Sequence, residues 1–452
     1  MAVDQGDLRD QQGLFADAAV SVETRADGGM VLRNRLELGP YPNSLIDRLE
    51  HWARATPDQV FLAERDGPGW RTLTYGQAWE EVRQLARRLA GLGLSAEQPL
   101  MIAAANSIAH AQTMLAAMLI GAPVAPESPA HAQGSGRRLR EAIELLTPGL
   151  IVRDAAGFEA LSELAPVSEP ELERARAAVG PDTIAKFLFT SGSAGAPKAV
   201  INTQRMLCSM QAALVQVWPF LARRPPVLVD WLPWHHTFGG NHCFGIALYN
   251  GGTFCIDDGK PLPGLVARTA ENLAAVGPSL LFNVPAGYEA LLPHLEADPE
   301  LAAKALGGLD LMFNAAAALP ASTRDRLAAL SPAPVVGSWG ATETAPEATM
   351  VYFEAPEAAN IGLPMPGVEI KLAPDDGRME IRVRGPNVTP CYWRAPEATA
   401  RAFDEEGFYR SGDAARLADP ARPDRGRRFD GRLAENFKLS SGTWVNAGAL
   451  RL

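Results

Sequence analysis

The sequence lacks the features that mark several large classes of protein. Its 452 residues contain four cysteines, Cys208, Cys243, Cys255 and Cys391, and no two of them form a C-x-x-C pair. Scattered cysteines argue against a disulfide framework or a structural zinc site, and they fit a reducing compartment such as the cytoplasm. The net charge is −10, so the chain has no general electrostatic attraction for nucleic acid or anionic membranes.

A long hydrophobic run is missing as well. The most apolar stretch, Thr113 to Pro126, falls short of the roughly 18 apolar residues that a membrane span needs. It is better interpreted as a buried helix that runs into a strand. Residues 1–13 are polar and partly acidic, unlike a signal peptide. We therefore expect a soluble, cytoplasmic protein with neither a membrane nor a nucleic acid as partner.

What the sequence does have is an alternation of strand-like and helical stretches. With 47% hydrophobic and 21% charged residues, the chain is globular, and it is too long for one ordinary core. Strand-like residues at 100–103, 187–189, 227–229 and 280–282 are interspersed with helical stretches such as 203–217. This alternation predicts an α/β fold with parallel sheets covered by helices on both faces.

The pattern changes from about residue 361. Residues 368–372 alternate between apolar and polar side chains, a turn follows at 375–377, and residues 379–383 alternate again. This is typical of a β-hairpin, and it predicts a smaller antiparallel unit near the end of the chain.

A glycine- and serine-rich loop follows the strand-like residues 187–189. Its sequence, TSGSAGAPK, covers residues 190–198. The glycines permit close backbone approach, hydroxyls and backbone N–H groups can surround phosphate oxygens, and Lys198 adds positive charge. It is not a Walker A loop, because proline precedes the lysine and no serine or threonine follows it. Taken alone, such a segment is more often a flexible surface loop than a phosphate site.

The pattern resembles the phosphate loop of the adenylate-forming superfamily, which includes acyl-CoA synthetases, peptide-synthetase adenylation domains and beetle-type luciferases. One departure is Ala194, where that family usually has threonine. A hydroxyl that would contact phosphate is lost there, so we expect a lower rate. The resemblance implies an ATP-phosphate site formed by Thr190, Ser191, Gly192, Ser193, Gly195 and Lys198.

A second segment, WGATE at residues 339–343, resembles the next motif of the same superfamily. The resemblance implies that Thr342 meets the α-phosphate and that Glu343 holds Mg²⁺, and a hard cation that bridges phosphates needs an oxygen ligand of this kind. Alone, a threonine–glutamate pair beside a glycine is more often a helix start. By the same resemblance, the ATP site also includes Ala316, Ala317, Trp339 and Gly340.

Two further segments follow in the superfamily's order. YRSGD at residues 409–413 implies that Asp413 accepts hydrogen bonds from both ribose hydroxyls, and a carboxylate suits a diol because it has several acceptor positions. Alone, this segment would be interpreted as a turn. Gly431 and Arg432 resemble the start of a hinge motif, in which the arginine also contacts the ribose.

The resemblance extends over about residues 40–452 and implies an α/β fold with two α/β subdomains plus a distorted β-barrel. The expected division is an N-terminal extension at 1–40, two α/β subdomains with the ATP and acyl sites at 41–360, a small antiparallel unit at 361–430, and a hinge with the start of a C-terminal domain at 431–452. In this family the C-terminal domain rotates between two half-reactions and supplies a lysine. Because the sequence stops at Leu452, we expect that domain and its lysine to be absent.

The acyl site is indicated by WHHTFGG at residues 234–240. This segment resembles the one that supplies an aromatic or histidine gate beside the substrate carboxylate, and we assign the gate to His236. A simpler interpretation of the histidine pair is buried or loop histidines without a ligand. A zinc site would need further ligands, for which His242 is the single candidate nearby.

Four stretches resemble feruloyl-CoA synthetases in particular: residues 231–242, 249–253, 256–261 and 437–444. A planar hydroxycinnamate needs a flat slot with apolar walls and one polar group at its far end. Glu347 would accept a hydrogen bond from a phenolic hydroxyl, and a solvated helix glutamate is the equally open alternative. The residues expected to line the slot are His236, Phe238, Gly240, Gly340, Ala345, Pro346 and Glu347.

The resemblance therefore implies a two-step reaction. The carboxylate of a small aromatic acid attacks the α-phosphorus of ATP to give acyl-AMP and pyrophosphate, and coenzyme A then displaces AMP. The protein is expected to act by alignment and electrostatic stabilisation. ATP and coenzyme A are the expected co-substrates, and Mg²⁺ is the expected cofactor. A homodimer is a possible assembly. The residues expected to be catalytic are Lys198, Thr342, Glu343 and His236.

Three alternatives stay open at this point. The first is the same chemistry on a benzoate or a medium-chain fatty acid. The second is a non-catalytic relative that binds nucleotide or acyl-AMP, which Ala194 favours. The third is an adenylation domain that loads a carrier protein. Against the second, a decayed site would have lost some of Lys198, Thr342, Glu343, Asp413 and Arg432.

Overall fold

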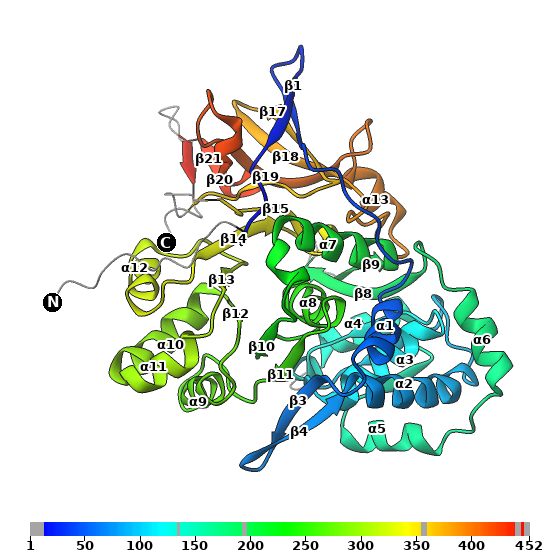
Figure 1. The fold of residues 1–452 in the computed structure, drawn as a ribbon. Helices are drawn as coiled ribbons and strands as arrows, with labels where there is room; N and C mark the ends of the chain where they lie inside the picture. The colour runs from blue at the N-terminus through cyan, green and yellow to red at the C-terminus, as the bar shows by residue number, and fades with distance from the viewer. Residues whose placement is uncertain (1–12, 133–135, 192–196, 354–358, 439–443, 447–452) are drawn as a thin grey trace.

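The computed structural model describes residues 13–132, 136–191, 197–353, 359–438 and 444–446. Helices and strands alternate through most of them, as Figure 1 shows, and the strands form three large sheets and one short pair. The α/β class expected from the sequence is therefore confirmed. The short pair consists of β21 (Asn436–Lys438) and β22 (Trp444–Asn446).

A five-stranded sheet carries the strand that precedes the glycine-rich loop. Its strands are β5 (Leu100–Ile102), β6 (Val124–Pro126), β7 (Leu150–Val152), β8 (Ile184–Ser191) and β9 (Pro197–Thr203). Their order is β7-β5-β6-β8-β9, with β9 antiparallel to β8 and the other neighbours parallel. The helices of this part are α2 (Tyr75–Ala90), α3 (Ile108–Leu119), α4 (Arg137–Leu146), α5 (Ala155–Ala160) and α6 (Glu169–Ala177). The apolar stretch from Thr113 to Pro126 forms the end of the buried α3 and then β6, as predicted.

A nine-stranded sheet forms the centre of the molecule. Its strands are β3 (Val60–Asp66), β4 (Gly69–Thr74), β10 (Val227–Asp230), β11 (Thr253–Ile256), β12 (Leu280–Asn283), β13 (Leu311–Asn314), β14 (Val335–Gly340), β15 (Glu347–Met350) and β16 (Leu363–Pro364). The order is β16-β15-β14-β13-β12-β10-β11-β3-β4. The strands from β14 to β3 in this order are parallel to their neighbours, whereas β4, β15 and β16 pair antiparallel.

Helices cover both faces of this sheet, as the alternation of elements predicted. Its helices are α1 (Ile46–Ala55), α7 (Gln204–Val217), the π-helical turn η5 (Phe238–Cys243), α8 (Phe244–Tyr249), α9 (Val266–Val276), α10 (Pro285–Ala297), α11 (Pro299–Leu306) and α12 (Ala321–Leu330). Along β10, Leu228 packs into the core shared with α7 and α8, while Val229 packs into the core shared with α9 to α12. Successive strand side chains point to opposite faces, so the two helix layers lie on opposite sides of the sheet (Figure 1).

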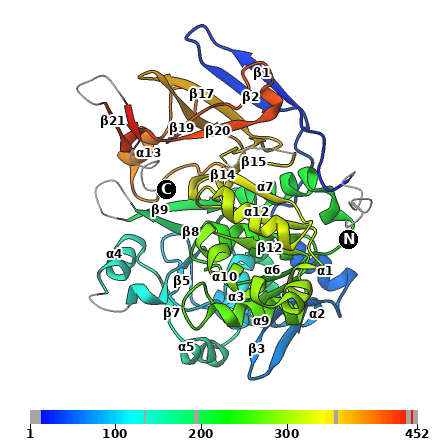
Figure 2. The ribbon, with the colours of Figure 1, turned by 90° about the vertical axis from the view of Figure 1, so that its left-hand side faces the viewer.

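A six-stranded antiparallel sheet lies above these two parts, as Figure 2 shows. Its elements are β1 (Val20–Thr24), β2 (Met30–Asn34), β17 (Glu369–Asp375), β18 (Arg378–Arg384), α13 (Pro396–Ala402), β19 (Tyr409–Leu417) and β20 (Arg427–Arg432). The predicted hairpin is confirmed as β17 and β18, whose turn contains Asp376 and Gly377 with φ angles of 41° and 79°.

The segment expected as an N-terminal extension takes part in this sheet. β1 and β2 form a hairpin, and β2 pairs with β17 so that Met30 lies opposite Leu372. β1 and β20 occupy opposite edges, so within the described residues the sheet is open. The resemblance implied a distorted barrel at this position, and the observed sheet corrects that detail because its two edge strands do not meet.

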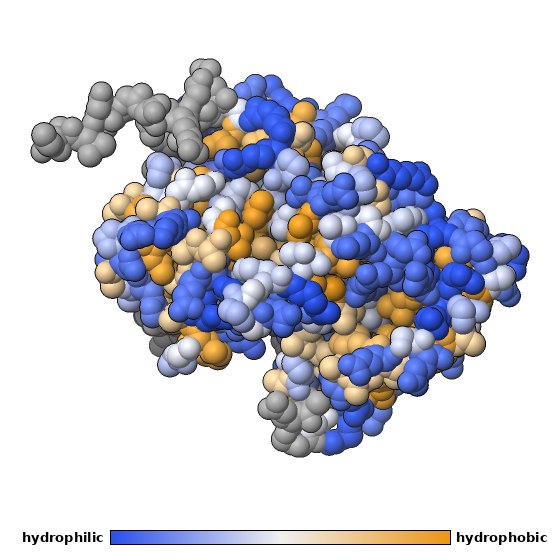
Figure 3. Space-filling model, turned by 60° about the horizontal axis from the view of Figure 1, so that its bottom comes forward, coloured by the Kyte–Doolittle hydropathy of each residue, from blue (hydrophilic) through white to orange (hydrophobic). Residues whose placement is uncertain are grey.

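The surface mixes polar and apolar groups. On the face drawn in Figure 3, hydrophobic side chains lie in several separate areas among hydrophilic ones. Across the described residues, no helix has the length and apolar character required to cross a bilayer.

Candidate active site

The central sheet brings several of the expected site residues to one edge. β10, β12, β13 and β14 are parallel, so the loops that leave their carboxyl ends share that edge, where open α/β sheets commonly bind ligands. Ala316 and Ala317 follow β13 and are exposed, and Ala316 has a φ of 72°. Gly340 ends β14 and is exposed, and Thr342 beside it is half-buried.

The loop from Gly340 to Glu347 is tightly packed. A Cβ at Gly340 would lie 1.8 Å from the carbonyl oxygen of Pro346, so glycine is required there. Ala345 has a φ of 59° and is buried. The Thr344 hydroxyl accepts a hydrogen bond from the Ala341 N–H at 2.9 Å. This packing fixes Thr342 and Glu343 at the start of the loop.

Glu343 is 7% exposed and has a phenolic partner that the sequence did not reveal. The Tyr392 hydroxyl donates to Glu343 Oε1 at 2.8 Å. Burial and the Glu343 carboxylate raise the pKa of both Tyr392 and Tyr409, so these phenols stay protonated and remain donors. The Lys198 ammonium lies 4.7 Å from the centroid of the Tyr392 ring. Tyr392 therefore connects the lysine of the glycine-rich loop to the expected metal ligand.

Residues 387–392, here called the bracing segment, form hydrogen bonds with the backbone of the Gly340–Glu347 loop. The Asn387 amide donates to the carbonyl oxygens of Thr344 and Glu347 at 2.9 and 2.8 Å. The Thr389 N–H donates to the Glu343 carbonyl at 2.8 Å. These contacts use backbone carbonyls, so no short motif in the sequence pointed to them.

The expected ribose-binding residues form a second cluster. Asp413 on β19 is buried, and its Oδ2 accepts a hydrogen bond from the Trp339 indole N–H at 2.9 Å. Arg432 lies opposite Asp413 in the β19–β20 register, with Nε 3.4 Å from Asp413 Oδ1. Trp339 thus orients the carboxylate by linking the central sheet to the antiparallel sheet.

The two ends of the glycine-rich loop lie on paired strands. Thr190 and Lys198 face each other across β8 and β9, and Ser191 is opposite Pro197. Gly192, Ser193, Ala194 and Gly195 lie outside the described residues, as do residues 439–443 of the 437–444 stretch.

The first half of the expected acyl wall is carried by η5. Phe238 is nearly buried, and its ring centroid lies 5.7 Å from that of Phe313. A Cβ at Gly240 would lie 2.2 Å from the Trp234 carbonyl, and the Gly240 carbonyl accepts a hydrogen bond from the fully buried Lys186 ammonium at 2.7 Å. Burial lowers the pKa of Lys186 to about 7. Lys186, which the sequence analysis did not single out, therefore positions this turn.

His236, the expected gate, is exposed beside the half-buried His235. Its ring centroid lies 4.5 Å from that of His235, and burial, followed by His131 and Arg138, lowers the pKa of His236. The imidazole is therefore neutral at pH 7. Across the described residues, no group of three or more His, Cys, Asp and Glu side chains could hold a metal ion, which leaves the zinc interpretation without support.

Glu347 differs from the solvated helix glutamate that was the alternative. It begins β15, its side chain is 1% exposed, and its Oε1 lies 2.5 Å from His242 Nδ1. The solvated interpretation is therefore wrong. His242, considered from the sequence as a zinc ligand, instead contacts a buried carboxylate.

The donors present fit a magnesium ion that arrives with ATP. Mg²⁺ in such sites keeps several waters and takes one or two protein carboxylates together with the substrate phosphates. Glu343 supplies one carboxylate, which Tyr392 orients and Lys198 approaches through the same ring.

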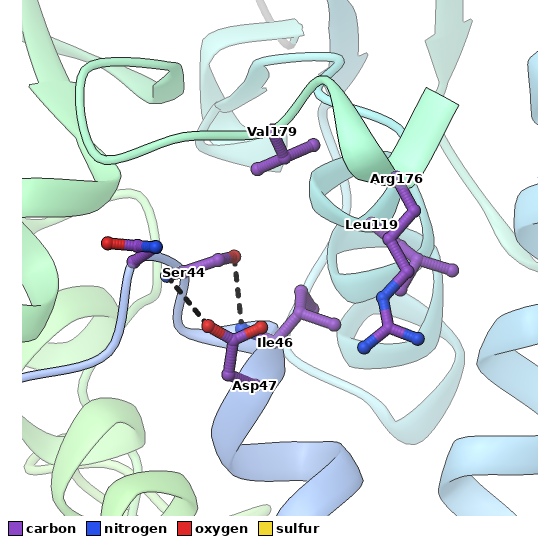
Figure 4. Close-up of a pocket in the computed structure, with 7 residues that line it drawn as sticks. Ser44, Ile46, Asp47, Leu119, Arg176 and Val179 are labelled. Atoms are coloured by element: carbon purple, nitrogen blue, oxygen red, sulfur yellow. Dashed lines mark hydrogen bonds between the residues drawn. The ribbon is translucent and has the colours of Figure 1, made fainter. Parts of the chain in front are cut away.

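A cavity of about 130 Å³ lies elsewhere in the molecule. Figure 4 shows it beside the start of α1, where the Ser44 N–H donates to Asp47 Oδ2 at 3.2 Å. It contains none of the expected site residues, so we do not assign the active site to it. Its lining residues are Asn43, Ser44, Ile46, Asp47, Leu119, Arg176 and Val179.

Comparisons with known proteins identify the family of this chain. A family model described as AMP-binding enzyme matches residues 49–393. The chain is 27% identical over 379 residues to a feruloyl-CoA synthase of Amycolatopsis sp, covering 77% of this chain and 72% of that protein. A solved malonyl-CoA ligase in a ternary product complex with methylmalonyl-CoA and AMP is 29% identical, with a TM-score of 0.67 over 87% of this chain and 82% of that chain.

Some similar proteins are much longer than this chain. A probable CoA ligase of Humulus lupulus is 27% identical over 250 residues, which is 52% of this chain and 41% of that protein. The chain therefore spans about two fifths of the length of this curated relative.

Proposed function

Because the chain belongs to the family of AMP-binding enzymes, we propose that it activates a carboxylic acid with ATP and transfers the acyl group to coenzyme A. The observation that carries this proposal is the convergence of the expected nucleotide residues. Tyr392 links Lys198 to Glu343, through its ring on one side and its hydroxyl on the other. Asp413 is in contact with both Trp339 and Arg432. Such a convergence argues against a decayed site.

In the first step, a carboxylate oxygen of the acid forms a bond to the α-phosphorus of ATP, and the bond to pyrophosphate breaks. No protein nucleophile is needed, because both reactants are held in line and the negative charge is stabilised in place. Lys198 and Thr342 would hold phosphate oxygens, while Asp413 would hold the ribose. Mg²⁺, held by Glu343, would neutralise phosphate charge when bound.

In the second step, the sulfur of coenzyme A bonds to the acyl carbon, and AMP leaves as the acyl–oxygen bond breaks. His236 would lie beside the acyl carboxylate. Because its pKa is lowered by burial, the imidazole is neutral and can orient the carboxylate without forming a fixed ion pair. This would leave the carboxylate free to react.

For the acid, we propose an aromatic substrate of the hydroxycinnamate type, such as ferulate. The aromatic rings of Phe238, Phe282 and Phe313 pack against one another and would supply apolar walls, and the buried Glu347 would supply a polar end. The similar feruloyl-CoA synthase supports the same substrate class. A benzoate or a medium-chain fatty acid is the alternative that the test must separate.

The test is calorimetric binding of non-hydrolysable acyl-AMP mimics to this chain. Feruloyl, benzoyl, octanoyl and acetyl versions are compared, with AMP alone as the baseline. We expect the feruloyl version to bind at least about ten-fold more tightly than the others, since a shaped pocket discriminates by this order. Preference for another acyl version would keep the chemistry and overturn the substrate. Failure of every version to bind would overturn the proposed function.

Catalysis is separated from simple binding by a second measurement. A ligase releases pyrophosphate from ATP only when its acid is present, whereas a non-catalytic relative binds the mimic and releases none. Ferulate-dependent release of pyrophosphate is the expected result.

A further inference from the structure

A buried acid–imidazole pair lies at the junction of η5 and β15. His242 is fully buried on η5, and Glu347 is 1% exposed at the start of β15. His242 Nδ1 lies 2.5 Å from Glu347 Oε1. Charged and polar side chains of this kind are rarely buried unless their hydrogen-bonding capacity is used.

Here that capacity is not met. Among the described residues, no hydrogen-bond partner is found for either ring nitrogen of His242 or for either carboxylate oxygen of Glu347, although His242 Nδ1 and Glu347 Oε1 lie in contact. The indole N–H of Trp218 is a third buried polar group without a partner, and the Trp218 and His242 ring centroids are 6.3 Å apart. A buried polar group without a partner destabilises the protein. Three such side chains in one place indicate a polar ligand that completes them.

The surroundings define the shape of that ligand. The His242 ring stacks on Phe313 at 4.8 Å and 18°, and it meets the edge of Phe282 at 5.0 Å. Phe238 lies one turn earlier on η5, and its ring centroid is 5.6 Å from that of His242. These rings surround the acid–imidazole pair with aromatic faces and edges, so a planar aromatic acyl group that reaches the pair would extend their packing.

We propose that His242 and Glu347 recognise a hydrogen-bond donor at the far end of the acyl group, which selects phenolic or arylamine acids and rejects acids with a second carboxylate. This rests on the proposed acyl-activating function and names its specificity residues. A phenolic O–H or an aromatic amine N–H donates to Glu347 Oε2, while His242 holds the other carboxylate oxygen. A second carboxylate would face Glu347 without compensation, and like charges in a buried site are strongly unfavourable.

A purely structural role for the pair makes a different prediction. If the pair only joined η5 to β15, then its loss would weaken binding of every acyl group by the same factor. A recognition role changes the ratio between two ligands that differ in one hydroxyl. The ratio is therefore the quantity to measure.

The experiment uses non-hydrolysable 4-hydroxycinnamoyl-AMP and cinnamoyl-AMP mimics with this chain and its Glu347→Gln variant. In the parent we expect the hydroxyl compound to bind about ten-fold or more tightly, the value of a hydrogen bond to a charged acceptor. In Glu347→Gln we expect that preference to fall to within about three-fold, because an amide oxygen is the weaker, uncharged acceptor. The exposed Glu144→Gln is the matched control and keeps the parent ratio.

A second measurement needs no variant. The 4-methoxycinnamoyl mimic accepts but does not donate hydrogen bonds, and the 4-carboxycinnamoyl mimic adds a negative charge. We expect the parent to bind both more weakly than the 4-hydroxy compound, and the carboxylate most weakly. Equal binding of the hydroxy and unsubstituted mimics, or an unchanged ratio in Glu347→Gln, would overturn the proposal while leaving the acyl-activating function intact. Failure of all mimics to bind would overturn the proposed function itself.

Discussion

The two halves of the candidate site treat their buried carboxylates differently. In the nucleotide half, Glu343 accepts a hydrogen bond from Tyr392, and Asp413 accepts one from Trp339. In the acyl half, Glu347 Oε1 lies 2.5 Å from His242 Nδ1, but neither Glu347 oxygen has a hydrogen-bond partner among the described residues.

We attribute this difference to the ligands proposed for the two halves. If ATP binds in the nucleotide half, then Tyr392 and Trp339 already orient its described carboxylates before the ligand arrives, which would reduce the reorganisation needed during reaction. An acyl pocket must discriminate between acids. A polar group that has no partner in the unliganded protein favours binding of the acid that forms a hydrogen bond with it. On this proposal, preorganisation would serve catalysis in the nucleotide half, and unpaired polar groups would serve selection in the acyl half.

The largest effect should come from breaking the nucleotide half. Glu343→Gln removes the charge expected to hold Mg²⁺, and we expect ferulate-dependent pyrophosphate release to fall by roughly 100-fold. Tyr392→Phe keeps the ring over Lys198 but removes the donor to Glu343, and we expect about a ten-fold loss. Glu144→Gln, on an exposed face, is the control. Equal rates in all four proteins would mean that Glu343 has no part in the reaction.

A smaller effect, of opposite sign, should come from the acyl half. Replacing the pair by apolar residues in His242→Leu/Glu347→Met removes two incompletely satisfied groups, and we expect the free energy of unfolding of the unliganded protein to rise by about 1 kcal/mol. Urea unfolding measures this change. Tyr392→Phe, which breaks a satisfied contact, should lower it by about 1 kcal/mol. Destabilisation by the double replacement would show that the pair is satisfied after all.

The last effect concerns the pH dependence of stability. Lys186 supports η5 through the Gly240 carbonyl, and burial lowers its pKa from 10.5 to about 7. Between these two pH values the folded protein binds fewer protons than the unfolded chain, so the contribution of Lys186 to stability rises with pH. We compare the free energies of unfolding of the parent and of Lys186→Met. From pH 7 to 9, we expect the value of the parent minus that of the variant to increase by at most about 1.4 kcal/mol per pH unit. Parallel curves for the two proteins would contradict this.

Much of the fold was predictable because strands and helices leave local patterns. The strands at 100–103, 227–229 and 280–282, the helix at 203–217 and the hairpin at 368–383 were all expected, and all are present. The pairing of β2 with β17 was not expected, because nothing in either strand identifies a partner more than 300 residues away.

For the site, sequence motifs supplied the residues that we expect to touch the ligand but not those that hold them in place. Tyr392, Asn387 and Lys186 act through hydrogen bonds to a side chain or backbone carbonyls that only the tertiary structure brings near. His242 was noticed for the wrong reason, since a histidine alone does not reveal whether a metal or a carboxylate lies beside it. Its real partner, Glu347, is 105 residues later in the chain.

The joining of β2 to β17 also has a consequence for how the protein is made. Arg33 on β2 donates to Glu369 on β17 at 2.7 Å, across 336 residues. A ribosome adds about 5–20 residues per second, so β2 leaves the ribosome roughly 20 to 70 seconds before its neighbour has been synthesised. During that interval the hairpin of β1 and β2 carries an unpaired edge that can join another chain. We therefore expect the hairpin of β1 and β2 to be exposed to pairing with other chains during translation, until β17 covers its edge.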